Sequence, residues 1–122
     1  MKSNSTYTFS APVSLFAMEV ASWYFVMLPE KILTEKLFRK EMKEKVTRFA
    51  RVMVTVTTED KESISWETAL LPHSSFMYSE KETEKKIKMS RLFIPIKKAI
   101  RKKLELDAGE ILHVSFRFSY TL

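Results

Sequence analysis

The chain contains no cysteine, which excludes a disulfide scaffold, a cysteine nucleophile and any zinc or iron–sulfur site that depends on thiolate ligands. Its single glycine, Gly109, cannot supply the glycine-rich loop with which dinucleotide-binding and P-loop enzymes cradle phosphates. The only histidines, His73 and His113, are far apart and have no third ligand at metal spacing. We therefore expect no metal and no cofactor, and nucleotide enzymes of the common types are excluded.

Long hydrophobic runs are also missing. The longest apolar stretch, Val20 to Leu28, covers only about half of the ~20 residues that a membrane helix needs. Glu19 falls where the apolar region of a signal peptide would run, so the N-terminal residues do not read as a signal peptide. These features predict a cytoplasmic protein without a membrane span.

The sequence does contain enough apolar material for a core. Of 122 residues, 45% are hydrophobic and 12% aromatic, which predicts one folded domain over residues 1–122. Between Pro72 and Ser90 no apolar period is sustained, and we expect a mobile charged loop over residues 73–90. The net charge of +6 permits weak attraction to nucleic acid or anionic surfaces without demonstrating either.

Six segments show strand patterns, with apolar residues at alternate positions or apolar residues throughout. They are Tyr7–Leu15, Trp23–Leu28, Val52–Thr57, Ile64–Leu70, Arg91–Ile94 and Leu112–Tyr120. Pro12 predicts an edge or bulged position in the first strand, because proline donates no ladder hydrogen bond.

Two segments have the 3.6-residue period of a short helix. One begins at Pro29 and fades into the charged run that starts at Lys40, and the other covers Lys97 to Leu104. Together the elements predict a mainly β fold, namely a small closed or split six-stranded β-barrel with two short capping helices.

The order of short motifs is similar to a known family. The motifs are Phe9-x-Ala11, the aromatic run Trp23–Leu28 closed by Pro29, the valine strand Val52–Val56, Leu70-Leu71-Pro72, the segment Phe93–Leu104, and Asp107-Ala108-Gly109-Glu110. Nearly the whole chain thereby resembles the DUF1905 family, small β-barrel domains of unknown function that are sometimes joined to a bacteriocin-protection segment. The resemblance implies a fold and no biochemical activity.

The chain departs from that family pattern at two turns. Asp60-Lys61 stands where the family usually has Asn-Gly, and Gly109-Glu110 where it has Gly-Asp. We also expect the loop after Pro72 to be longer than the family's short connection, and we expect no fused segment. The order of strand, proline, basic helix, Gly-acid turn and strand is also similar to the AbrB-like barrels that bind DNA.

A basic helix face is the first candidate site. The period places Ile96, Ala99, Ile100 and Leu104 on one face of the last helix. It places the candidate phosphate-binding residues Lys97, Lys98, Arg101 and Lys102 on the other face. A solvated face is the interpretation we prefer, because no base-reading set of asparagine, glutamine or arginine accompanies the cations.

An aromatic pocket is the second candidate site, and its lining residues would be Trp23, Phe25, Trp66 and Phe93. Large aromatic residues on strands more often belong to a core. No catalytic constellation is present, because no serine lies in a nucleophile motif with a positioned histidine and acid.

The sequence therefore predicts a non-catalytic barrel domain that binds a small molecule or a protein partner. The alternative is a nucleic-acid-binding protein that uses the basic helix of an AbrB-like barrel. A homodimer and the identity of the ligand stay open, and no membrane partner is expected.

Overall fold

The computed structural model describes residues 5–17, 22–44, 50–72 and 92–119. Seven strands form one sheet in the order β1-β7-β4-β5-β6-β3-β2, with every pair antiparallel. The strands are β1 (Tyr7–Pro12), β2 (Ser14–Ala17), β3 (Ser22–Met27), β4 (Ala50–Thr57), β5 (Ser63–Pro72), β6 (Leu92–Pro95) and β7 (Ile111–Phe118). The predicted mainly β, barrel-like fold is confirmed.

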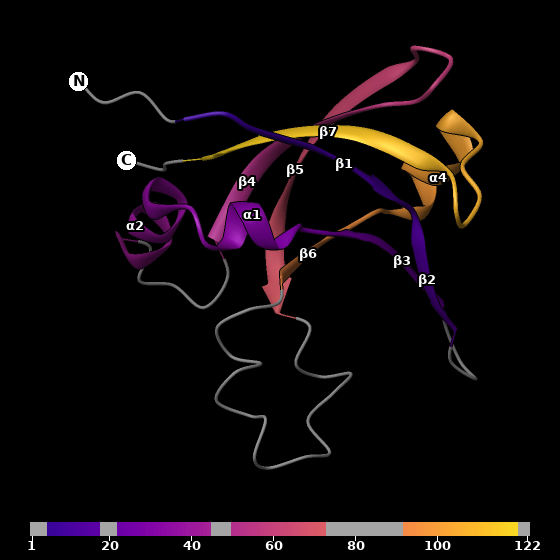
Figure 1. Ribbon diagram of the computed structural model, residues 1–122. Helices are drawn as coiled ribbons and strands as arrows, with labels where there is room; N and C mark the ends of the chain where they lie inside the picture. The colour runs from indigo at the N-terminus through magenta and orange to yellow at the C-terminus, as the bar shows by residue number, and fades with distance from the viewer. Residues whose placement is uncertain (1–4, 18–21, 45–49, 73–91, 120–122) are drawn as a thin grey trace.

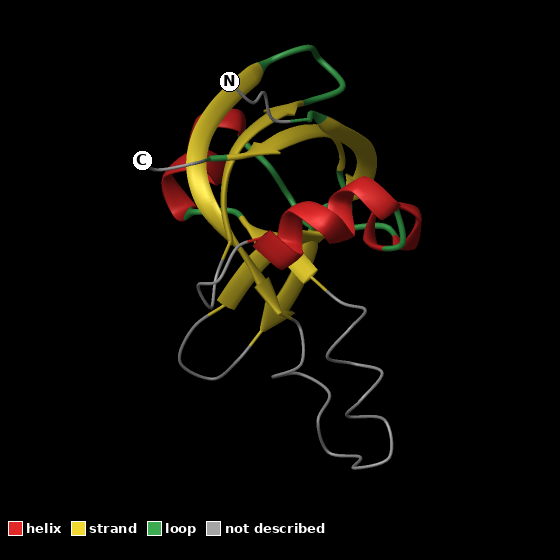
Figure 2. Ribbon diagram, turned by 90° about the vertical axis from the view of Figure 1, so that its left-hand side faces the viewer, coloured by secondary structure: helices red, strands yellow, loops and turns green. Residues whose placement is uncertain are grey.

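The sheet curls into a half-barrel (Figures 1 and 2). The long strand β5 pairs with β4 over most of its length and with β6 at its end, so it turns the sheet through one corner. The strands β1 and β2 lie at opposite ends of the strand order but are separated in the chain by one residue, Val13.

The first strand was predicted to be continuous, and the structure divides it at Val13. The Val13 N–H donates to Glu110 O over 2.8 Å, and the Val13 carbonyl accepts from the Gly109 N–H over 2.7 Å. Pro12 immediately before has no N–H to continue the ladder. The chain therefore changes partner at this point, from β7 to β3, which gives seven strands instead of six.

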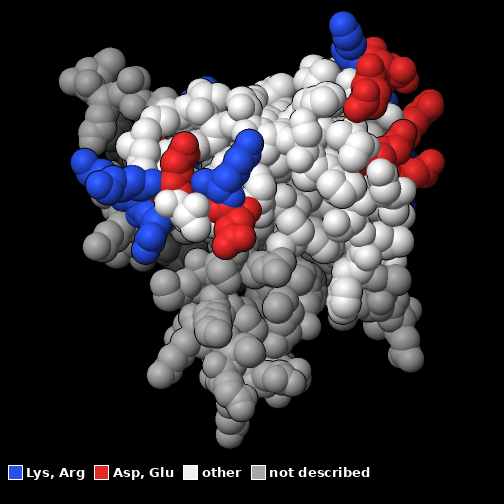
Figure 3. Space-filling view, in the orientation of Figure 1, with Lys and Arg blue, Asp and Glu red and all other residues white. Residues whose placement is uncertain are grey.

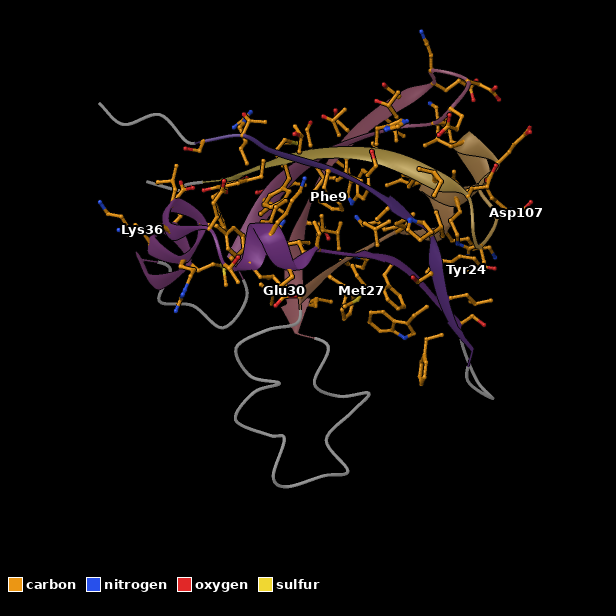
Figure 4. The ribbon with its side chains drawn as sticks, in the orientation of Figure 1. Phe9, Tyr24, Met27, Glu30, Lys36 and Asp107 are labelled. Atoms are coloured by element: carbon orange, nitrogen blue, oxygen red, sulfur yellow. The ribbon has the colours of Figure 1, made fainter. Side chains whose placement is uncertain are left out.

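Three short helices occur among the described residues, where the sequence predicted two. They are α1 (Glu30–Leu33), α2 (Lys36–Glu44) and α4 (Lys98–Leu104). The first predicted helix is interrupted after Leu33. The Thr34 hydroxyl bonds to the carbonyl of Glu30, the Glu35 N–H bonds to the carbonyl of Ile32 three residues before it, and α2 begins at Lys36. In Figure 4, Lys36 marks the α2 end of the molecule, and Tyr24 and Asp107 mark the α4 end.

The inner side of the sheet forms the hydrophobic core. In β4 and β7 alternate residues are buried, as predicted from the period of two. Val52, Val54, Val56 and Phe118 have 0% exposure. Phe38 of α2 packs on Phe118, with ring centroids 5.7 Å apart, and Ile100 and Leu104 of α4 join the same core from the other end.

The turn between β4 and β5 keeps a backbone conformation that glycine would prefer. Lys61 has φ of 70°, and its N–H donates to the carbonyl of Thr58 over 2.9 Å. A type I turn followed by a left-handed residue is a standard connection of longer hairpins. The replacement of Asn-Gly by Asp60-Lys61 therefore leaves the hairpin intact and places a lysine in a left-handed position.

The predicted loop over residues 73–90 lies outside the described residues, as does the predicted end of the last strand at Tyr120. Among the helices of the described ranges, none is long and apolar enough to cross a membrane.

Candidate functional site

The inside of the half-barrel is filled by side chains. Val26, Val52, Val54, Val56 and Leu112 are completely buried there. The predicted pocket residue Trp66 stands opposite Val54 in the β4–β5 register and packs against this core, half-buried. Its indole N–H has no hydrogen-bond partner in the described part of the chain. Ligand binding in the barrel interior has no support from this packing.

The other three predicted pocket residues lie together on the outer side of the sheet. Val26 and Ile94, which stand opposite each other, face the core, so their strand neighbours face outwards. The Phe93 ring lies 6.2 Å from that of Trp23, edge to face, and 5.0 Å from that of Phe25. The structure therefore brings three predicted residues together and leaves Trp66 on the opposite side.

A fourth aromatic residue extends this group. Phe16 of β2 stands directly opposite Trp23 of β3. Both are exposed, at 36% for Phe16 and 41% for Trp23, whereas Phe25 and Phe93 are buried. We call Phe16, Trp23, Phe25 and Phe93 the outer aromatic face. Sequence analysis missed Phe16 because the predicted first strand ended at Leu15, and the separate strand β2 that contains Phe16 was not foreseen.

The predicted phosphate-binding residues do not form one uniform face of α4. Lys97, Lys98 and Lys102 are exposed, but Arg101 is half-buried, with its guanidinium carbon 3.8 Å from the centre of the Tyr24 ring. Its Nε has no hydrogen-bond partner within the described ranges. The Arg101 guanidinium therefore covers the Tyr24 ring in a cation–π contact.

The predicted apolar face of this helix was wrong at Ala99, which is exposed. Ile96, Ile100 and Leu104 are buried as predicted. Arg101, which was assigned to the polar face, is half-buried where Ala99 is exposed, since an arginine stem is apolar along most of its length.

A groove runs between β1 and the two helices at the other end of the molecule. Tyr7 and Thr8 of β1 line one side together with Ser5 and Thr6, which precede the strand. Lys31, Ile32, Glu35 and Leu37 of the helical segment line the other side, and the volume is about 590 Å³. We call it the strand–helix groove. In Figure 1, α1 is drawn just below β1. β1 is an edge strand, as Pro12 predicted, since in the described sheet it pairs only with β7.

Tyr7, which lines the strand–helix groove, forms a buried polar pair with Glu41. The Tyr7 hydroxyl donates a hydrogen bond to Oε1 of Glu41 in α2, and the two residues are 5% and 7% exposed. Burial, followed by the hydrogen bond and the negative charges of Glu41 and Glu35, raises the pKa of Tyr7 above its usual value near 10. The hydroxyl therefore stays protonated and anchors β1 to α2.

The chain was next compared with known proteins. The family model described as "Domain of unknown function (DUF1905)" matches residues 9–116. The protein belongs to the DUF1905 family. No curated protein and no solved structure matches the chain.

The match of the DUF1905 model spans the outer aromatic face, α4 and the helical wall of the strand–helix groove. Ser5 to Thr8, the strand wall, precede the matched residues. Residues of the motifs that carried the resemblance have structural roles. Phe9 and Leu28 pack in the core, and Gly109, with φ of 95°, lies in the turn whose backbone bonds to Val13.

On the outer face of this DUF1905 domain, three polar side chains contact one another in a row that sequence analysis did not predict. Ser10 Oγ lies 2.7 Å from Nδ1 of His113, and Nε2 of His113 lies 3.4 Å from Glu59 Oε2. The register explains the first contact, since Ser10 and His113 stand opposite each other on β1 and β7. His113 and Glu59 are half or more exposed, so solvent competes for the proton transfers that a hydrolytic triad requires.

Acidic side chains gather around a hollow of about 400 Å³ beside α4, where Figure 3 shows red atoms at the β4–β5 turn. The lining carboxylates are Glu59, Asp60, Glu62, Glu105 and Glu110. Among the described residues, no group of three or more potential ligands has the geometry to hold a metal ion.

Proposed function

We propose that the protein is a non-catalytic binding module that takes up an extended segment of a protein partner in the strand–helix groove. The observation that carries the proposal is the position of the groove, with an edge strand on one side and a helix on the other. An extended peptide can add to such an edge as a further strand, while its side chains contact the helix. Its volume falls within the range of about 300–1,000 Å³ common for ligand sites.

The two walls of the groove would have different tasks. On the strand wall, backbone groups on the side of β1 away from β7 would supply hydrogen bonds that do not depend on the partner's sequence. On the helical wall, Leu37 is 46% exposed and would be covered by an apolar side chain of the partner. Lys31 and Glu35 lie beside it and would select polar groups of opposite charge.

Two features support binding without catalysis. The Tyr7 hydroxyl has its pKa raised and donates to Glu41, so it is unsuited to act as a base near neutral pH. The chain Ser10–His113–Glu59 lies on the open outer face and does not line the groove. We expect the protein to act in the cytoplasm, in keeping with the absence of cysteine.

The experiment selects ten-residue peptides from a random displayed library on the immobilised full chain, and then measures the selected peptides by calorimetry and amide NMR. We expect peptide-induced shifts at Ser5–Thr8 and Lys31–Leu37. Substitution Leu37→Ser should weaken binding about fivefold, since roughly half of a leucine side chain loses its cover. Ile111→Ser, at a comparably exposed residue of β7, is the matched control and should leave affinity unchanged.

A second measurement examines strand addition directly. The selected peptide is synthesised with alternate backbone amides N-methylated, in both registers. One of the two versions should lose binding, because only alternate amides of an added strand face β1. If shifts map elsewhere, or if both methylated peptides bind like the parent, the groove is not a strand-addition site.

Nucleic-acid binding is a second candidate function, favoured by the exposure of Lys97, Lys98 and Lys102 on and before α4. The AbrB-like arrangement that the sequence suggested would use all four basic residues. Arg101 is engaged with Tyr24, which leaves three lysines for phosphates. Binding through these lysines alone would be steeply dependent on salt and indifferent to base sequence.

A further inference from the structure

The register of the sheet places two exposed aromatic residues opposite each other, on strands that lie beside the segment leading into α4. Phe16 of β2 stands opposite Trp23 of β3. On the other side of β3, Pro95 of β6 stands opposite Phe25, and the Ile96 N–H donates to Tyr24 O over 2.9 Å.

Lys97 lies two residues beyond the last paired residue of β6, Pro95. It is still extended, with φ of −67° and ψ of 155°, and it directly follows Ile96, whose N–H donates to Tyr24 O. Residues that stand opposite each other share a face of the sheet. Continuing the β3–β6 register by two residues brings Lys97 opposite Trp23, and the row is then Phe16, Trp23 and Lys97, with Lys98 next in the chain. Neighbouring strands lie about 4.8 Å apart, so the row forms one continuous surface.

We propose that this row, which we call the aromatic–lysine row, binds single-stranded nucleic acid. Bases would stack on Phe16 and Trp23, and the phosphates between and beyond them would contact Lys97 and Lys98. The inference deepens the second candidate function above, nucleic-acid binding, and is independent of peptide binding in the strand–helix groove. It assigns a task to exposed aromatic residues that phosphate binding by α4 leaves unused.

The support beneath Trp23 favours stacking. The Trp23 ring meets the Phe93 ring at 89° with 6.2 Å between centroids, and Phe93 packs in turn on Phe25. Trp23 thus packs against one buried ring, which is itself held by a second, and remains 41% exposed. A ring held in place in advance loses little conformational freedom when a base covers it.

The charge and the chemistry of the row favour a single strand over a duplex. In a duplex the bases are paired and stacked on each other, and Phe16 and Trp23 would then contribute nothing. Lysines beside aromatic rings are the combination that single strands use, since every base offers a flat face and every nucleotide carries a charge. An acidic peptide would satisfy the lysines as well, so it belongs among the probes.

The test uses the full chain carrying Trp66→Phe, which leaves Trp23 as the only tryptophan. The substitution removes an indole N–H that has no partner among the described residues, so the fold should be kept. The probes are a ten-nucleotide oligothymidine, a ten-base-pair duplex and a ten-residue peptide of alternating glutamate and valine. Fluorescence quenching reports on Trp23, and anisotropy of labelled probe reports on affinity at several salt concentrations.

We expect the oligothymidine to quench Trp23 and to bind more tightly than the duplex and the peptide. Phe16→Ala, and Trp23→Ala in the otherwise unchanged chain, should each weaken its binding about tenfold, which corresponds to about 1.4 kcal/mol per stacked base. Lys97→Ala with Lys98→Ala should reduce the slope of log affinity against log salt by about 1.4, since each phosphate contact on a single strand contributes about 0.7.

A matched variant controls for net charge. Lys36→Ala with Lys40→Ala removes two exposed lysines of α2, at the opposite end of the molecule. This variant should change the affinity for the oligothymidine and the salt slope less than Lys97→Ala with Lys98→Ala does. Circular dichroism of each variant establishes that the loss of binding is not a loss of fold.

Three results would overturn the inference. Equal binding of duplex and single strand, unaffected by Phe16→Ala and Trp23→Ala, would leave α4 as a phosphate-binding helix without stacking. Tighter binding of the acidic peptide would make the row a protein contact. No binding of any probe would remove the second candidate function as well, while peptide selection in the strand–helix groove would be unaffected.

Discussion

The hydrogen bond between Tyr7 and Glu41 joins the edge strand β1 to α2 and leads to the sharpest prediction about stability. Tyr7→Phe removes the hydroxyl and keeps the ring, which stacks on Phe116 at 5.2 Å and meets Phe38 edge to face at 5.5 Å. The variant therefore removes the hydrogen bonds of the hydroxyl, with Glu41 and with Ser5, and keeps the packing of the ring. Both partners are nearly inaccessible to solvent, so water cannot replace the lost donor at no cost.

The expected magnitude is set by the charge of the acceptor. A hydrogen bond to a charged group contributes about 1.5–3 kcal/mol, compared with about 1 kcal/mol for a neutral pair. We expect Tyr7→Phe to lower the free energy of unfolding by about 2 kcal/mol. At this chain length that corresponds to a fall in Tm of about 8 °C.

The assay is urea unfolding of the parent, Tyr7→Phe, Glu41→Met and the double variant. Glu41 has further interactions, and a double-mutant cycle cancels them. We expect a coupling free energy of about 1.5–2 kcal/mol between the two side chains. A coupling below about 0.5 kcal/mol would show that the pair does not hold β1 to α2, and the reasoning from burial would then be wrong.

The pH dependence provides an independent check on the same pair. Burial and Glu41 raise the pKa of Tyr7 in the folded protein above its usual value near 10. The stabilisation is complete below pH 10 and is lost progressively as the pH rises through 10 towards the folded-state pKa. The parent should therefore lose more stability than Tyr7→Phe between pH 9 and pH 11. Parallel pH curves for the two proteins would contradict the raised pKa.

Three further predictions concern single side chains and are checked by thermal unfolding. Lys61→Gly should raise stability by about 1 kcal/mol, because Lys61 holds a left-handed conformation that costs a residue with a Cβ about that much; Asp60→Gly in the same turn, where φ is not positive, should not stabilise. Arg101→Ala should cost about 1 kcal/mol, since the guanidinium and its stem cover Tyr24. Leu104→Ala should cost about 3 kcal/mol by opening a cavity where α4 meets the core.

Local periodicity was sufficient to predict the strands that bury one face. In β4 and β7 the apolar residues at alternate positions are the buried ones, and both strands lie inside the sheet between two neighbours. Each such residue is constrained by the same requirement, contact with the core, so the sequence pattern and the structural pattern coincide. Pro12 likewise identified β1 as an edge.

Periodicity failed to predict the features that depend on contacts between residues far apart in the sequence. The break at Val13 depends on hydrogen bonds to Gly109 and Glu110, almost a hundred residues away, and no local pattern encodes them. The exchange of Ala99 for Arg101 on the inner side of α4 depends on the position of Tyr24, which a helical wheel does not contain. A helix of seven residues has too few apolar positions to fix its own rotation.

Only the register of the strands shows which of the predicted pocket residues lie on the same side of the sheet. Trp23, Phe25, Trp66 and Phe93 look alike in the sequence, as large aromatic residues on strands. Their environments differ because Trp66 stands opposite the buried Val54, whereas Phe25 and Phe93 alternate with the buried Val26 and Ile94. Pairing therefore sends one tryptophan inwards and leaves the other exposed.

The strand order also predicts that the two proposed binding surfaces would not compete. The strand–helix groove uses the edge of β1 on one side of Val13, and the aromatic–lysine row begins at Phe16 of β2 on the other side. Because the chain changes partner at Val13, β1 and β2 occupy opposite ends of the strand order and present different edges. A variant in one surface should thus leave binding at the other unchanged, so that the peptide and the single strand can be titrated on the same protein without mutual inhibition.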